Sequence, residues 1–168
     1  MQEFAPRTAT PHDQPAHWVV GWSMTTYTER QRLKYTPAQL FDLIVDVERY
    51  PDFMPWIVDS RVRRRDDRTM NTELTVGAGP LRKRFSTIAV LDRPHRVDIT
   101  SRDSMFERFE MHWVLQPTAE GETNVEYRLD FKFSSRVLQM LMTAAFARQA
   151  AATVSAFRRR AQYLYVPR

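Results

Sequence analysis

The sequence predicts an α+β domain in which a curved antiparallel sheet wraps around a long C-terminal helix, with two short helices after the first strand. Three observations support this fold class. Apolar and polar residues alternate through several segments between residues 57 and 133, as in strands with one buried face. After Ser135, apolar residues recur every three or four positions, which is the spacing of one helix face. The length of 168 residues is enough for one domain with a substantial core.

The N-terminal part of the domain is predicted to hold one strand and two short helices. The strand covers residues 25–35, where Thr and Tyr are frequent. Thr36 and Pro37 indicate the start of a helix over 37–45, because Thr caps free amides and Pro fits the first helical position. Asp46 is expected to cap a second helix over 47–50, and Pro51 is expected to interrupt it.

The sheet is predicted from rows of alternate residues that share one face. Turn sequences such as Asp66-Asp67-Arg68 separate these rows and favour hairpins. The expected inner rows are Val58, Ser60 and Val62; Met70, Thr72, Leu74 and Val76; Phe85, Thr87, Ala89 and Leu91; Phe109, Met111, Trp113 and Leu115; and Val125, Tyr127, Leu129, Phe131 and Phe133.

The last helix is predicted from a cap at Ser134 or Ser135 to about Tyr163, with an apolar stripe that runs from Met140 to Leu164. It spans about 40 Å at 1.5 Å per residue, enough to cross a whole sheet. Seven of its residues between 144 and 156 are alanines. Such small side chains leave two alternatives, a sheet that closes tightly on the helix or a cavity between them.

The chain is predicted to consist of a flexible N-terminal tail, residues 1–23, and a ligand-binding domain, residues 24–168. Pro6, Pro11 and Pro15 and the lack of periodicity indicate the tail. Its apolar segment from Trp18 to Trp22 is either the start of the first strand or a patch that docks elsewhere.

Composition limits the function classes. The sequence has no cysteine, which excludes disulfides, thiolate metal sites and a cysteine nucleophile. The four histidines do not share metal-ligand spacing, and the strand carboxylates fall on the outward phase. We therefore predict no metal site and no catalytic residue. The apolar segments are too short for a membrane span, and the N-terminus does not resemble a secretory signal. A cytoplasmic protein, peripheral at the inner membrane, is expected.

The formal charge of +5 favours anionic partners, although basic runs are also common on solvated surfaces. Three runs are candidates for docking to an anionic membrane or to RNA. These are Arg61, Arg63, Arg64 and Arg65; Arg82, Lys83 and Arg84; and Arg158, Arg159 and Arg160.

Several separated motifs between Thr25 and Leu164 carry a family resemblance. The most specific is Tyr50-Pro51-Asp52-Phe53-Met54-Pro55-Trp56. Others in the same order include Glu73-Leu74-Thr75-Val76-Gly77, His112-Trp113 and Asp130-Phe131-Lys132-Phe133. Together they resemble the ubiquinone-binding branch of the START-like (polyketide cyclase/dehydrase) superfamily. The chain departs from that pattern at Met105–Phe109 and at Ala78-Gly79-Pro80, in loops expected at the rim of the cavity.

The resemblance implies the helix-grip fold and three hypotheses of function. The first is non-catalytic binding of ubiquinone or a related polyprenyl lipid, without a required cofactor, by a lipid chaperone that supports respiratory electron transport and quinone biosynthesis. The second is a ribosome-binding inhibitor of subunit association, because a bacterial branch of the family is described as such a toxin. The third is a cyclase-like cavity enzyme, which requires an ionisable group inside the cavity. The oligomeric state stays open.

For the first hypothesis, large apolar side chains on the inward rows and on the helices are the candidate cavity lining. They are Phe41, Phe53, Trp56, Leu74, Phe109, Met111, Trp113, Phe131, Met142 and Phe146. Tyr50 and Pro51 are expected to shape the cavity mouth.

Overall fold

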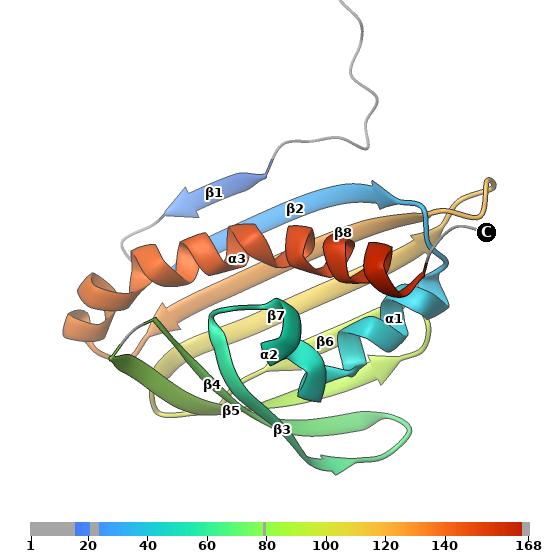
Figure 1. Cartoon of the computed structure of the whole chain (residues 1–168). Coiled ribbons are helices and arrows are strands. Elements are labelled where there is room, and N and C mark those ends of the chain that lie inside the picture. Colours follow the sequence, from blue (N-terminus) through green and yellow to red (C-terminus); the bar gives the residue numbers. More distant parts are fainter. Residues whose placement is uncertain (1–15, 21–23, 79, 166–168) are drawn as a thin grey trace, which may run out of the picture.

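The computed structural model describes residues 16–20, 24–78 and 80–165, and its centre is one eight-stranded antiparallel sheet (Figure 1). The strand order is β1-β2-β8-β7-β6-β5-β4-β3, so the chain enters and leaves the sheet near one edge. The strands are β1 (His17–Val20), β2 (Thr25–Leu33), β3 (Ile57–Arg65), β4 (Thr69–Ala78), β5 (Leu81–Asp92), β6 (Arg96–Thr100), β7 (Phe106–Pro117) and β8 (Thr123–Phe133).

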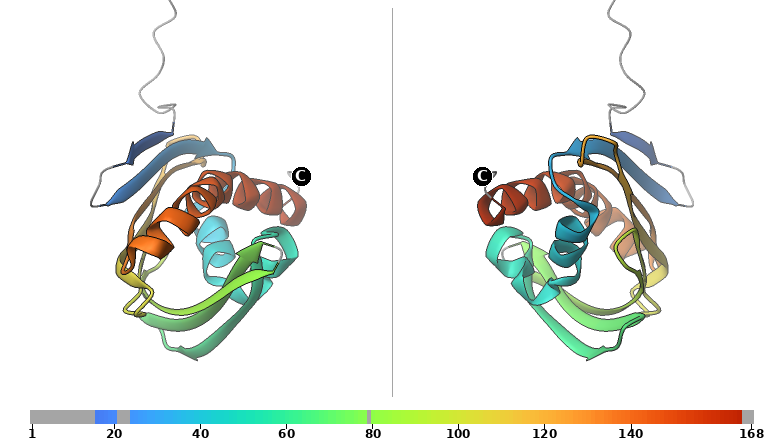
Figure 2. Two further views of the ribbon diagram at one scale, coloured as in Figure 1. Left: turned by 90° about the vertical axis from the view of Figure 1, so that its left-hand side faces the viewer. Right: turned by 90° about the vertical axis from the view of Figure 1, so that its right-hand side faces the viewer.

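A long helix lies along the concave face of this sheet (Figure 2). It is α3 (Arg136–Leu164), and the Ser135 side chain accepts a hydrogen bond from the Leu138 amide at its start. The shorter helices α1 (Pro37–Val45) and α2 (Tyr50–Phe53) lie on the same face, joined by a 3₁₀ turn, Val47–Arg49. The predicted α+β helix-grip architecture is confirmed.

The first edge strand, β1, pairs with β2 in antiparallel register, with Val19 opposite Thr26. It extends the sheet by one strand beyond the first strand predicted from the sequence, so the two short helices follow β2. The rest of the predicted tail, residues 1–15 together with 21–23 and hence Trp22, lies outside the described residues.

The short helices depart from the prediction in two respects, at Pro51 and at Asp46. Thr36 caps α1 in a complete capping box with Gln39, as its sequence indicated. Pro51, however, lies in the first turn of α2 and does not interrupt a helix. The reason is that a first-turn residue has no intrahelical partner for its amide, so proline loses nothing there. Asp46 makes no side-chain capping bond.

The inward rows are as predicted except at the start of β3. A bulge between Ile57 and Asp59 shifts the alternation by one residue, so Ile57 and Ser60 are buried and Val58 is exposed. A bulge places two residues of one strand opposite one residue of its partner, which breaks the period of two locally. The buried Ser60 hydroxyl donates to the Val47 carbonyl and ties β3 to the 3₁₀ turn.

The ends of α3 also differ from the predicted stripe. Its buried side chains begin at Met142 and continue through Phe146, Ala150, Val154 and Phe157 to Ala161. Met140, predicted to face the core, is 81% exposed, and Leu164 is 44% exposed. Met140 lies in the second turn of α3 and Leu164 is its last residue, so both are near the ends of the helix. No described helix combines the length and the apolar character that crossing a bilayer requires.

Candidate functional site

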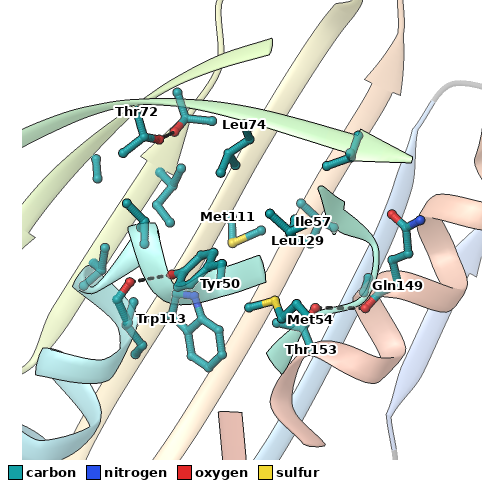
Figure 3. Close-up of a pocket in the computed structure, with 18 of the residues that line it drawn as sticks. Tyr50, Met54, Ile57, Thr72, Leu74, Met111, Trp113, Leu129, Gln149 and Thr153 are labelled. Atoms are coloured by element: carbon teal, nitrogen blue, oxygen red, sulfur yellow. Dashed lines mark hydrogen bonds between the residues drawn. The ribbon is translucent and has the colours of Figure 1, made fainter. Parts of the chain in front are cut away.

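An apolar cavity of about 90 Å³ lies between α3, the short helices and the inner face of the sheet. Its wall comes from α1, the 3₁₀ turn and α2, from strands β3 to β8, and from the middle of α3 (Figure 3). The lining residues are Ile44, Val47, Tyr50, Met54, Trp56, Ile57, Met70, Thr72, Leu74, Val76, Phe85, Thr87, Ala89, Val97, Ile99, Phe109, Met111, Trp113, Tyr127, Leu129, Phe146, Gln149, Ala150, Thr153 and Phe157. Of the two alternatives for the alanine-rich helix, the structure has the cavity.

Six of the ten predicted lining residues reach this cavity, namely Trp56, Leu74, Phe109, Met111, Trp113 and Phe146. The other four lie outside the lining: Phe41 packs under the Arg93 guanidinium, 5.4 Å from its ring centroid, and Phe53, Phe131 and Met142 are packed in the surrounding core. Tyr50, predicted at the mouth, is buried in the wall, whereas Pro51 is half-buried and does not line the cavity.

Several lining residues were not among the predicted ones although their pattern was visible. Met70 and Thr87 belong to inner rows that the alternation identified. They were not predicted to line the cavity because only some of the large apolar residues of those rows were chosen as candidates. Gln149 and Thr153 are one turn apart on the otherwise apolar face of α3, and the Thr153 hydroxyl donates to the Gln149 carbonyl at 2.9 Å (Figure 3). Polar residues inside an apolar stripe were the signal that could have found them.

Aromatic rings around the cavity form two separate clusters. The phenylalanine cluster contains Phe85, Phe106, Phe109, Phe131, Phe133 and Phe146, with ring centroids 4.9–6.4 Å apart. The tyrosine cluster contains Tyr27, Tyr50, Phe53, Trp113, Tyr127 and Phe157, with centroids 4.6–6.0 Å apart. On α3, Phe146 and Phe157 are about 16 Å apart at 1.5 Å per residue. The clusters therefore pack against different halves of the helix.

The cavity wall holds a few polar groups. The hydroxyls of Thr72 and Thr87 are hydrogen-bonded to each other at 2.6 Å across β4 and β5. The Tyr50 hydroxyl donates to the Ile44 carbonyl. The Tyr127 hydroxyl is buried without a hydrogen-bond partner among the described residues. Burial is the largest cause of a pKa of the Tyr127 hydroxyl that lies well above its ordinary value. Both lining tyrosines are therefore neutral at physiological pH.

None of the described residues that line the cavity is Asp, Glu, His, Lys or Arg. A buried carboxylate, that of Glu29, lies on the inner phase of β2, which the alternation rows had not included. It accepts hydrogen bonds from the Tyr27 hydroxyl, at 2.6 Å, and from the Gln31 amide. Glu29 is thus held by residues of its own strand and does not line the cavity. Among the described lining residues, only the tyrosine hydroxyls could act in acid–base catalysis.

The first two arginine runs meet around Glu73 on the outer face of the sheet, although the register places Arg65 and Lys83 on the inner phase of β3 and β5. Arg63 on β3 and Arg84 on β5 both contact Glu73 on β4, at 2.8 and 3.7 Å. Arg61 pairs with Asp59 at 3.1 Å. Arg64, Arg65 and Arg82 are exposed, Lys83 is half-buried, and these four form no ion pair with another described residue. The β3–β5 edge therefore carries a positive surface that is only partly neutralised.

The third run, on α3, is divided between exposed and packed side chains. Arg158 and Arg159 are exposed. Arg160 is packed against α2, with its guanidinium 5.5 Å from the Phe53 ring centroid and 3.8 Å from the Asp52 carboxylate. This side chain joins α3 to α2, so it has a structural contact in addition to its charge.

A cluster of potential metal ligands, Glu110, His112 and Asp130, lies on the outer face of β7 and β8, with ligand atoms within 4.8 Å of one another. Each of these side chains already has a protein partner. Asp130 accepts from Arg128 at 2.8 Å, Glu110 accepts from Arg108 at 2.9 Å, and His112 Nδ1 is 2.6 Å from Asp98. The cluster is accounted for by these contacts.

The fold and the cavity define a START-like ligand-binding domain. Residues 33–158 match the family described as polyketide cyclase/dehydrase and lipid transport, so the chain belongs to this family. Among solved structures, an aromatase/cyclase from Streptomyces has a TM-score of 0.72 at 13% identity, covering 83% of this chain and 94% of that one, which shows the shared fold.

Other relatives are more similar in sequence. The ribosome association toxin RatA of Pseudomonas aeruginosa is 36% identical over 145 residues, which are 84% of this chain and 99% of the relative. The mitochondrial coenzyme Q-binding protein coq10 of Schizosaccharomyces pombe is 30% identical over 121 residues, 68% of this chain and 73% of the relative. An 18 kDa protein from Caulobacter crescentus, solved in solution, is 33% identical with a TM-score of 0.66, covering 84% of this chain and 99% of that one.

Proposed function

We propose that this chain associates with ribosomes and hinders the association of their subunits. The observation that carries this proposal is the 36% identity to the ribosome association toxin of P. aeruginosa over almost the whole length of that relative. The partly neutralised arginines of the β3–β5 edge support it, because ribosomal RNA presents closely spaced phosphates and each cation that reaches one releases counterions.

Sedimentation with purified ribosomal subunits across a salt series tests this proposal. The variant Arg64→Gln/Arg65→Gln/Arg82→Gln should bind more weakly, with a salt slope reduced by about one for each phosphate that is no longer neutralised. The matched control is Arg30→Gln/Arg32→Gln/Arg96→Gln, which removes the same charge from arginines already paired with Glu126, Glu120, Glu122 and Asp98. Absence of co-sedimentation at physiological salt, or equally weakened binding in both variants, would contradict the proposal.

A second candidate function is binding of ubiquinone or a related polyprenyl lipid in the cavity. The specific observation that favours it is the apolar wall of the cavity between α3 and the sheet, and the 30% identity to the coenzyme Q-binding relative supports it. A cavity of about 90 Å³ is smaller than the roughly 300 Å³ at which typical ligand sites begin, so a quinone ring would have to widen it and a long tail would have to extend beyond it.

Adjacent residues of β5 provide a matched test of this second candidate. Ala89 lines the cavity, whereas Val90 is 53% exposed on the opposite face. Ala89→Phe should fill the cavity and abolish uptake of ubiquinone from liposomes, while Val90→Phe should leave uptake unchanged. Mass spectrometry of an organic extract measures the bound quinone, and circular dichroism checks the fold, because overpacking costs about 1–3 kcal/mol. Wild-type protein that takes up no quinone would refute this candidate.

A further inference from the structure

The first turns of α3 expose three large apolar side chains on one face. Val137 is 62% exposed, Met140 is 81% exposed and Leu141 is 64% exposed. They follow one another at steps of three and one residues, so i, i+3 and i+4 positions place them together on the helix surface. We call these three residues the α3 apolar patch. A contiguous exposed group of this kind, on a surface that is otherwise rich in charge, indicates a contact site.

The patch lies at the same end of the molecule as the hairpin between β4 and β5 (Figure 1), and the left view of Figure 2 shows the two on opposite sides of that end. This hairpin exposes a further apolar residue, Leu81, at 47%. The strands that the hairpin joins contribute Val76 and Phe85 to the cavity wall, and α3 contributes Phe146 further along. The exposed apolar residues therefore belong to the same elements, α3 and β5, that line the cavity further along.

Each group of apolar residues has an arginine next to it in the sequence. Arg136 directly precedes Val137, and Arg82 directly follows Leu81, and both arginines are exposed. No ion pair between described residues involves either of them, whereas the nearby Arg84 is 3.7 Å from Glu73. Exposed apolar side chains accompanied by unneutralised cations match a bilayer surface with anionic headgroups, because the apolar chains enter the acyl boundary while the cations contact phosphate.

We propose that the α3 apolar patch, with Leu81, docks this protein onto an anionic lipid bilayer. This inference rests on the second candidate function, since a protein that carries a polyprenyl lipid must take it from a membrane. RNA would satisfy the two arginines but would leave Val137, Met140 and Leu141 in water, so the patch favours lipid over the ribosome. The arginines of β3 are not part of the docking surface.

Flotation with phosphatidylcholine vesicles, with and without phosphatidylglycerol, tests the proposal on the full chain. Met140→Gln/Leu141→Gln should weaken binding to the anionic vesicles by about tenfold or more, because glutamine keeps helix propensity but cannot enter the acyl region. The control is Tyr163→Gln/Leu164→Gln, which replaces two exposed apolar residues at the other end of the same helix and should bind as the wild type does. The variant Arg82→Gln/Arg136→Gln should bind anionic vesicles more weakly, by roughly fivefold for each cation removed, and its binding to neutral vesicles should not change.

Wild-type protein that does not float, or a Met140→Gln/Leu141→Gln variant that floats as well as wild type, overturns the docking surface. So does a wild-type dimer that this variant converts to a monomer in sedimentation velocity, because the patch is then an interface between two copies. Thermal unfolding checks that each variant is folded. If the double substitution perturbs the helix, Val137→Gln provides a second variant. Binding of decylubiquinone without vesicles separates the two proposals: its absence in a protein that floats refutes the ligand and leaves the docking surface.

Discussion

The two aromatic clusters on either side of the cavity have similar ring spacing but different chemistry. The phenylalanine cluster has no polar side-chain atom, so shape and buried area alone hold it together. The tyrosine cluster includes Tyr27, Tyr50 and Tyr127, and each hydroxyl needs a partner once it is buried. Tyr27 and Tyr50 have partners, at Glu29 and at the Ile44 carbonyl. The difference teaches that one half of the core depends on volume, whereas the other also depends on hydrogen-bond geometry.

The largest expected effect is the loss of one ring from either cluster. Phe146→Ala removes the ring that lies 5.1 and 5.5 Å from those of Phe131 and Phe133, and Phe157→Ala removes the ring that lies 5.4 and 5.0 Å from those of Tyr50 and Trp113. Each should lower the free energy of unfolding by about 3–5 kcal/mol, measured by urea denaturation. Met140→Ala, on the exposed part of the same helix, should change it by less than about 0.5 kcal/mol. A decrease for Phe157→Ala as small as that control would show that its cluster is not packed as described.

A smaller effect separates two hydroxyls within the tyrosine cluster. Tyr50→Phe should cost about 1 kcal/mol, because it leaves the Ile44 carbonyl without its donor. Tyr127→Phe removes a buried hydroxyl that has no partner among the described residues, so stability should be unchanged or rise by up to about 1 kcal/mol. Chemical denaturation of the two variants measures the difference in sign. Equal destabilisation would mean that the Tyr127 hydroxyl is satisfied as well as that of Tyr50.

Alternation and capping were enough to predict the fold because each follows from local backbone geometry. The capping box of Thr36 and Gln39 depends on residues three positions apart, and the inner rows of β4 and β5 follow the period of two. The bulge that exposes Val58 could not be predicted in the same way, since it depends on pairing with β4 and has no signal of its own in the sequence.

The cavity lining was predicted only in part for a similar reason. A row identifies which face a residue occupies but not whether the space beyond it is filled. Phe131 and Phe109 face inward on neighbouring strands and are paired directly in the register, yet only Phe109 reaches the cavity. The other packs into the phenylalanine cluster, 5.1 Å from the ring of Phe146. Which ring faces empty space depends on how α3 lies over the sheet, and this is a property of the packed molecule.

The smallest expected effect is the response to acid, which should come from the outer face of the sheet and not from the clusters. Burial alone would raise the pKa of the Asp130 carboxyl, but hydrogen bonds from Arg128 and Thr26 outweigh it and hold this pKa below its ordinary value. The same balance lowers the pKa of Asp98 through Arg96 and His112. A carboxyl with a depressed folded-state pKa stabilises the fold above its unfolded pKa of about 4, and this contribution is lost as the pH falls through the folded value.

Stability should therefore decline between about pH 5 and pH 2, and Asp130→Asn should flatten the decline. Asp67→Asn, in the exposed turn before β4, is the control that removes a carboxylate without those hydrogen bonds. Urea denaturation at a series of pH values gives the slopes. Because neither cluster contains a carboxylate, Tyr127→Phe and Tyr50→Phe should keep the wild-type slope. A changed slope in either variant would mean that the charges of the outer face and the packing of the inner face are coupled through the sheet. The difference between the two clusters would then depend also on the strands that join these two faces.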